Sequence, residues 1–182
     1  MATGRNYGIV QSIRILLEGR PGSGKTTLAR RIVSGLRERD IPVTGFTTEE
    51  IRHAGTRVGF AIETADGDRG TLAHVDLPGP PRVGKYGVDL DALEELAIPA
   101  VRPSSGSLVV IDELGKMELA SNPFREAVEV LFASPADVVA TVHAFRHPFT
   151  DALKARPGVE RLQVTAANRD DLARILVRKL VA

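Results

Sequence analysis

The residue types best suited to chemistry lie in one glycine-rich segment near the start of the chain. This segment matches the pattern G-x-x-x-x-G-K-[ST] and consists of Gly19, Arg20, Pro21, Gly22, Ser23, Gly24, Lys25 and Thr26, followed by Thr27. Glycines let the backbone turn tightly and bring its N–H groups close to phosphate oxygens. Lys25 adds a charge that can reach the β- and γ-phosphates, and the Thr26 hydroxyl is placed to ligate Mg²⁺. The segment predicts a polyphosphate-binding loop; the alternative is a turn that binds no ligand.

The residues on both sides of the segment agree with phosphate binding. Residues 13–17 form a short apolar run typical of a buried strand. After the segment, Leu28, Ile32 and Leu36 recur at the spacing of a helix. A strand that leads through such a loop into a helix points the helix N-terminus, with its partial positive charge, at the bound anion.

Two neighbouring acids follow a second apolar run. Residues 108–111 are all apolar, and Asp112 and Glu113 come directly after them. We expect Asp112 to be the Walker B aspartate, which holds Mg²⁺ opposite Thr26, although an aspartate can also merely cap a strand end. Glu113 can accept a proton from water and direct that water at the γ-phosphate, which favours hydrolysis over transfer to another hydroxyl. The alternative is a Glu113 turned to solvent or paired with Lys116.

Further charged residues leave two interpretations open. Lys116 can neutralise charge on the phosphates, or it can pair with Glu118 or Glu113. Arg52 either points into the cleft or lies at a solvated hairpin end. Asn168 precedes the last helix and is expected to cap it, whereas a second interpretation places Arg169 over the base or near the phosphates.

The order of the predicted elements favours an α/β fold. Strands are expected at residues 12–18, 43–48, 57–64, 70–75, 86–88, 108–111, 137–141 and 160–164. Helices are expected at residues 25–39, 124–133, 148–155 and 170–181. A further helix is expected to be capped by Asp89 or Asp91 and to run to about residue 100. Alternating strands and helices predict three layers around a mainly parallel sheet, with ligands at the carboxyl ends of the strands. The turn at 65–68 predicts an antiparallel hairpin insertion at 46–76 within a single domain, 12–182, and residues 1–11 are expected to be a flexible leader.

Composition limits the class of protein further. The chain has 182 residues, a formal net charge of +1 and no cysteine. A chain of this length forms one domain, and its balanced charge gives no electrostatic reason for nucleic-acid or membrane binding. Disulfides and thiolate metal sites are excluded, and His143 and His147, without metal-ligand partners, are expected to be structural. No signal peptide or membrane-spanning run is visible, so we expect a cytoplasmic protein, and a monomer.

Taken together, these motifs resemble one known family, the nucleoside-triphosphatases of the thermophilic NTP-phosphatase type, of which the human cancer-related nucleoside-triphosphatase is a relative. The resemblance covers nearly all of residues 13–180. It rests on the runs 19–28, 45–52, 57–60, 82–86, 109–119, 164–165 and 168–170. The loop alone does not select a family. The run Asp-Glu-Leu-Gly-Lys-Met-Glu-Leu at 112–119 is much more specific.

The resemblance implies slow, Mg²⁺-dependent hydrolysis of ATP, GTP and other nucleoside triphosphates to the diphosphate and phosphate, on a RecA-like P-loop sheet. It also implies that Arg52, Lys116, Asn168 and Arg169 lie near the nucleotide. One departure is Thr47, where the family often has an aromatic residue, which argues against base stacking at this position. Two other hypotheses are a small-molecule or nucleotide kinase, with the hairpin as acceptor site or lid, and a slow nucleotide-gated switch with a protein or RNA partner.

Overall fold

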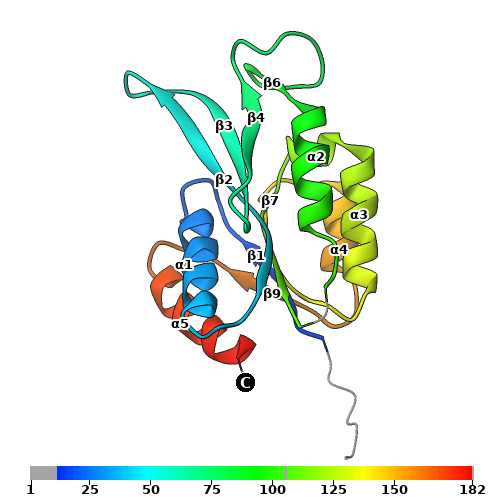
Figure 1. Cartoon of the computed structure of the whole chain (residues 1–182). Coiled ribbons are helices and arrows are strands. Elements are labelled where there is room, and N and C mark those ends of the chain that lie inside the picture. Colours follow the sequence, from blue (N-terminus) through cyan, green and yellow to red (C-terminus); the bar gives the residue numbers. More distant parts are fainter. Residues whose placement is uncertain (1–11, 105, 182) are drawn as a thin grey trace, which may run out of the picture.

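A nine-stranded sheet with helices on both faces forms the centre of the chain, whose computed structural model describes residues 12–104 and 106–181 (Figure 1). The strands are β1 (Arg14–Glu18), β2 (Val43–His53), β3 (Thr56–Thr64), β4 (Arg69–His74), β5 (Arg82–Val83), β6 (Tyr86–Val88), β7 (Leu108–Leu114), β8 (Asp137–Val142) and β9 (Val159–Gln163). The helices are α1 (Lys25–Arg37), α2 (Leu90–Ala100), the short 3₁₀ helix η1 (Glu118–Ala120), α3 (Asn122–Ala133), α4 (Pro148–Lys154) and α5 (Arg169–Leu180). The predicted leader, residues 1–11, lies outside the described residues.

The sheet has a parallel half and an antiparallel half. Its strand order is β5-β6-β4-β3-β2-β7-β8-β1-β9. Strand β2 belongs to both halves, because Val43–Phe46 pair in parallel with β7 whereas Phe46–His53 pair antiparallel with β3. The predicted hairpin at 46–76 is therefore a continuation of the main sheet, and it is extended further by β6 and β5. The predicted three-layer α/β class is confirmed.

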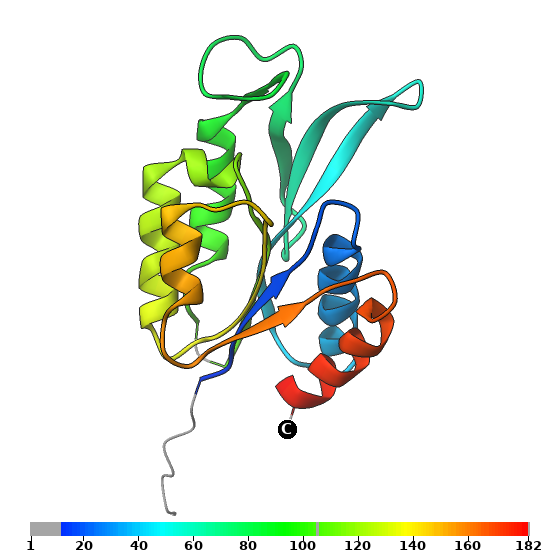
Figure 2. The same ribbon diagram turned by 180° about the vertical axis from the view of Figure 1, so that it is seen from behind.

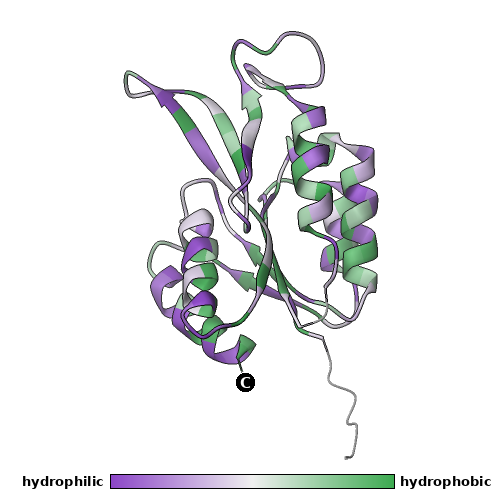
Figure 3. Cartoon of the chain, in the orientation of Figure 1, coloured by the Kyte–Doolittle hydropathy of each residue, from purple (hydrophilic) through white to green (hydrophobic). Residues whose placement is uncertain are grey.

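Helices lie on both faces of the sheet. Helices α1 and α5 lie on one face, and α2, α3 and α4 lie on the other (Figures 1 and 2). Along β1, Leu17 packs toward α1 and Leu16 toward the opposite face, as the two-residue repeat of a strand requires. Leu28, Ile32 and Leu36 are fully buried, which confirms the predicted stripe of α1. The colouring by hydropathy shows apolar residues on the sides of the helices that face the sheet (Figure 3).

Several element boundaries differ from the prediction for local reasons. Strand β2 runs to His53, five residues beyond the predicted end, because it stays paired with β3. Helix α2 is capped by Asp89, whose side chain accepts the Ala92 N–H at 2.9 Å. Helix α3 begins at Asn122 because Ser121 caps it. The short elements β5 and η1 were not predicted, since two or three residues show no periodicity.

One glycine is required where β2 passes β7. Gly45 has φ +103°, and a Cβ at this position would lie only 1.9 Å from the carbonyl oxygen of Val110. The close approach keeps β2 against β7 just before β2 enters the antiparallel half.

Within residues 12–104 and 106–181, none of the helices combines the length and hydropathy needed to traverse a bilayer.

Candidate functional site

The glycine-rich loop connects the end of β1 to the start of α1. Gly22 and Gly24 have positive φ angles, +79° and +94°, which glycine adopts without strain. Gly24 is the N-cap of α1, so no side chain caps the helix, and the first turn carries no acid. The N–H groups and the positive end of the helix dipole are therefore available to an anion.

Lys25 lies at the centre of this loop. Its side chain is buried, and its Nζ donates to the carbonyl oxygens of Gly19 at 3.0 Å and Arg20 at 3.4 Å. The Oε2 of Glu113 lies 3.6 Å from the same Nζ. The structure thus brings Glu113 beside the loop lysine, and it does not show the alternative pairing of Glu113 with Lys116.

Asp112 is buried near the carboxyl end of β7. Strand β8 separates β7 from β1, and Thr141 of β8 donates to Asp112 Oδ1 at 2.7 Å. Asp112 is 1 % exposed, and its Oδ2 has no hydrogen-bond partner within the part of the chain that the structure describes. Burial raises the pKa of Asp112, although the Thr141 and Thr26 hydroxyls and the Lys25 charge act to lower it.

These residues fit a divalent cation. An unpartnered, buried carboxylate oxygen close to the Thr26 hydroxyl is an oxygen donor set of the type that Mg²⁺ binds. In the described ranges no group of three or more His, Cys, Asp or Glu side chains is arranged to hold a metal. The protein ligands here would therefore be Asp112 and Thr26, and phosphate oxygens would complete the coordination.

Two further acids lie close to Asp112. Burial raises the pKa of Glu113, the Lys25 charge opposes that shift, and Asp112 adds to it. Burial, and then the Glu113 charge, raise the pKa of Glu118 to about 8. Glu118 is therefore protonated at neutral pH, and its Oε2 accepts the Gly115 N–H at 3.1 Å. The sequence indicates Glu118 only as a partner for Lys116, since nothing local to it predicts full burial.

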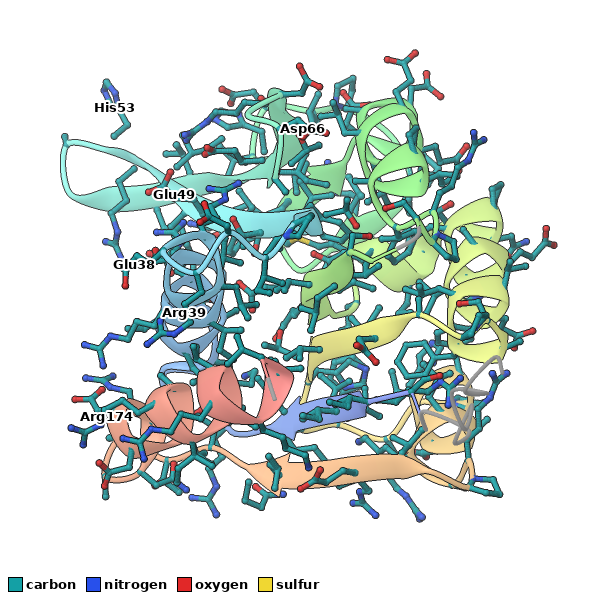
Figure 4. All side chains as sticks on the ribbon, turned by 60° about the horizontal axis from the view of Figure 1, so that its bottom comes forward. Glu38, Arg39, Glu49, His53, Asp66 and Arg174 are labelled. Atoms are coloured by element: carbon teal, nitrogen blue, oxygen red, sulfur yellow. The ribbon has the colours of Figure 1, made fainter. Side chains whose placement is uncertain are left out.

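A cavity of about 430 Å³ lies in front of the loop. Its walls include Gly22, Gly24, Thr26 and Thr27 of the loop and α1, Arg30, residues 48–50 of β2, Phe60, Glu113 and Arg169. Glu49 of β2 lies over α1, with its carboxylate 3.8 Å from Arg30 (Figure 4). Another cavity, of about 580 Å³, lies between α1 and the base of the hairpin, and none of the glycines of the phosphate-binding loop lines it. Of these two cavities, the one in front of the loop adjoins the N–H groups that are available to an anion.

Two residues at the start of α5 were expected near the nucleotide, and only the Arg169 side chain is seen to contact the loop. A Cβ at Gly24 would lie 2.5 Å from Arg169 Cδ, so the Arg169 side chain packs directly on the loop. Asn168 occupies the N-cap position, but its Oδ1 accepts the Thr165 N–H at 2.8 Å and its Nδ2 donates to Gln163. Asn168 is therefore the N-cap residue of α5, as one interpretation expected, but its side chain fixes the preceding turn and makes no capping hydrogen bond to the helix.

Arg52 is not brought to the loop. Its guanidinium donates to Glu50 and, at 2.8 Å, to the Gly55 carbonyl oxygen at the end of the β2–β3 hairpin. The neighbouring His53 is seen at the tip of this hairpin in Figure 4. The solvated-hairpin interpretation of Arg52 is therefore the one that the structure shows.

The loop between β8 and α4 contains His143, Phe145 and His147, and Lys116 lies against it. The Lys116 ammonium lies 4.6 Å from the centre of the Phe145 ring, and among the described residues it forms no ion pair. His143 stacks on Phe145, and burial lowers the pKa of His143 to about 4. His147 accepts the Phe149 N–H and caps α4, as expected for a structural residue.

Comparison with known proteins identifies the family. The sequence profile of the NTPase family matches residues 14–177. The chain belongs to the NTPase family. Among family relatives, the nucleoside-triphosphatase THEP1 of Thermotoga petrophila is 46% identical over 162 residues, covering 88% of each chain. The human cancer-related nucleoside-triphosphatase is 39% identical over 173 residues, which cover 87% of this chain and 91% of the human protein.

A solved structure of an NTPase-family protein has the same fold. The crystal structure of THEP1 from the hyperthermophile Aquifex aeolicus superimposes with a TM-score of 0.83 at 35% identity. The match covers 92% of this chain and 99% of the Aquifex chain. The chain therefore has the P-loop NTPase fold of this family.

Proposed function

We propose that the chain hydrolyses nucleoside triphosphates to the diphosphate and inorganic phosphate, with Mg²⁺ and with broad base tolerance. The observation that carries the proposal is the position of Glu113, whose carboxylate lies 3.6 Å from the ammonium of the loop lysine, Lys25. A candidate general base is thus next to the group that would hold the γ-phosphate.

The loop supplies the binding energy in this proposal. The N–H groups of residues 19–27 and the N-terminus of α1 hold the β- and γ-phosphates, and Lys25 exchanges its loop carbonyl partners for phosphate oxygens. Arg169 lies against Gly24, where its guanidinium can pack on the flat face of any base. Because such stacking does not discriminate between bases, we expect ATP, GTP, CTP and UTP all to be substrates.

The chemical step needs one proton transfer. The Glu113 carboxylate accepts a proton from a water molecule and orients that water toward the γ-phosphorus. The new P–O bond forms as the bond to the β,γ-bridging oxygen breaks, and Lys25 offsets the negative charge on the phosphoryl oxygens. Asp112 and Thr26 would hold Mg²⁺, which supplies charge neutralisation between the β- and γ-phosphates. Lys116, whose ammonium lies 4.6 Å from the centre of the Phe145 ring, is assigned to charge stabilisation on the phosphates, a role that requires its side chain to turn toward the loop.

Steady-state phosphate release tests the proposal. The purified chain is incubated with ATP, GTP, CTP and UTP, with Mg²⁺ and with EDTA in its place. We expect release from all four nucleotides, at rates within about tenfold of one another, and loss of release in EDTA. Release from none of the four with Mg²⁺ present would refute the proposed hydrolysis, and equal release in EDTA would refute the metal requirement. The cytoplasmic location and the monomeric state remain predictions.

A further inference from the structure

A second cavity adjoins the phosphate site on the side away from α5. It has a volume of about 590 Å³, which is within the range of small-molecule sites. It shares five residues with the cavity at the loop: Pro21, Lys25, Thr48, Phe60 and Glu113. The two spaces therefore meet at the loop lysine and at the candidate base, where the γ-phosphate is expected.

The remaining walls of this second cavity are mostly apolar. They come from the antiparallel half of the sheet, from η1 and the residues just before it, and from the loop after β8. Besides the shared Phe60, the apolar residues are Leu72, Val83, Met117, Ala144 and Phe145. Water attack needs no such surface. An apolar wall of this kind favours a ligand with a substantial apolar body.

The charge of this second cavity argues against a second phosphorylated ligand. Of the described residues that line it, Lys25 and Lys116 are the cations, and Lys25 is assigned to the triphosphate. Glu118 is protonated at neutral pH, since its pKa is about 8, and His143, with a pKa of about 4, is neutral. One remaining cation is too few for a nucleotide or a sugar phosphate, so the occupant is expected to be uncharged.

We infer that this cavity binds a neutral, largely apolar alcohol, and that the hydroxyl of this alcohol accepts the γ-phosphoryl group in competition with water. The inference rests on the proposed function, because the same bound triphosphate supplies the phosphoryl group. Glu113 takes the hydroxyl proton, the alcohol oxygen forms the new bond to phosphorus, and the bond to the β,γ-bridging oxygen breaks. The products are a phosphate monoester, the nucleoside diphosphate and one proton.

Competition between water and simple alcohols tests the inference. Benzyl alcohol, cyclohexylmethanol and 1-hexanol serve as apolar probes, and glycerol serves as a polar alcohol of similar reactivity. The full chain is incubated with ATP, Mg²⁺ and one alcohol, and ³¹P NMR measures the ratio of phosphate monoester to inorganic phosphate. We expect monoester from at least one apolar probe, at a ratio at least about tenfold above that of glycerol.

Variants that fill the cavity locate the site. Val83→Trp and Ala144→Trp introduce bulk from two different parts of the cavity wall, and Ala144 is an exposed residue of the loop after β8, where a larger side chain is not expected to disturb the core. Both should lower the monoester-to-phosphate ratio by about tenfold or more. The matched control Val130→Trp, at an exposed position of α3, should leave the ratio unchanged.

The possible outcomes separate this inference from the proposed function. Phosphate release without monoester from any apolar probe refutes the inference and leaves the hydrolase proposal standing. Monoester from glycerol equal to that from the apolar probes, or an unchanged ratio in both tryptophan variants, also refutes the inference. Absence of both monoester and phosphate refutes the proposed function itself.

Discussion

At the residue scale, Asp112 and Glu118 are both buried acids, but only Asp112 has a free carboxylate oxygen where a cation can offset its charge. Burial raises the pKa of both carboxyls, so in the absence of metal each costs free energy when ionised. The two acids should therefore respond differently when replaced by their amides.

Asp112→Asn should separate metal binding from folding. The substitution removes the buried charge, so the free energy of unfolding without metal is not expected to fall. The Mg²⁺ concentration for half-maximal phosphate release should rise by about tenfold or more, because the amide is a weaker ligand. Asp91→Asn, at an exposed position of α2, is the control and should change neither quantity. An unchanged Mg²⁺ requirement in Asp112→Asn would remove Asp112 from the metal site.

Glu118→Gln should change how stability depends on pH. The folded pKa of about 8 lies above the ordinary value of 4.5, so between these values the folded state binds a proton that the unfolded state has released. The free energy of unfolding of the wild type therefore falls as pH rises from about 4.5 to 8, by up to about 1.4 kcal/mol per pH unit. Glu118→Gln lacks this loss.

Urea unfolding of both proteins at pH 5, 6, 7 and 8 measures the difference. We expect the amide variant to gain stability relative to the wild type as pH rises. Glu129→Gln, an exposed position on α3, should parallel the wild type. Parallel curves for Glu118→Gln and the wild type would mean that the Glu118 pKa is close to its ordinary value.

At the element scale, the junction between β2 and β7 depends on Gly45. Gly45→Ala places a methyl group against the Val110 carbonyl, 1.9 Å away before any movement, and must push the two strands apart. We expect a loss of about 3 kcal/mol or more in the free energy of unfolding. Gly55→Ala is the control, since Gly55 also has positive φ but has no atom within 4 Å of the new methyl group.

Gly55→Ala should cost only about 1–2 kcal/mol, the strain of the left-handed conformation alone. Chemical denaturation of the two variants gives both values. Similar losses in the two proteins would show that β2 can move away from β7 without disturbing the sheet.

The elements also show which parts of the site local sequence can predict. The loop at 19–27 follows β1 directly, and Asp112 and Glu113 lie near the carboxyl end of β7, so the parallel direction of these strands brings them to one edge of the sheet. Arg52 and Arg169 could not be placed in this way, because each is set by long-range packing: Arg52 stays with Glu50, and Arg169 reaches back to Gly24.

The same limit applies to the antiparallel half of the sheet. The hairpin turn at 65–68 was visible in the sequence, but pairing of β4 with β6 was not, because the connection carries no local periodicity. As a result, the contributions of Leu72 and Val83 to a cavity beside Glu113 could not be predicted. Full burial of Glu118 was equally hidden, since burial depends on the whole fold around η1.

At the scale of the whole molecule, the phosphate site joins both halves of the sheet. The loop and α1 belong to the parallel half, whereas Thr48 and Phe60 come from strands of the antiparallel half. A ligand that contacts both halves binds only the folded chain, and at a hundred times its Kd it adds about 2.7 kcal/mol to the free energy of unfolding.

A non-hydrolysable ATP analogue with Mg²⁺ should therefore raise the unfolding midpoint by about 5–10 °C at that saturation. Lys25→Met should abolish the increase, because the loop loses the buried ammonium group that is proposed to contact the phosphates. Thermal unfolding followed by circular dichroism measures both. An equal increase in wild type and Lys25→Met would show that the nucleotide binds elsewhere on the chain.

The central claim is that Glu113 activates the attacking water beside Lys25. It is tested most directly by measuring ATP affinity and single-turnover phosphate release for Glu113→Gln alongside the wild type. The amide keeps the shape of the side chain but cannot accept the proton. We predict nucleotide affinity within a few-fold of wild type and phosphate release slower by roughly 100- to 10,000-fold. Release at a rate close to that of the wild type would contradict the account.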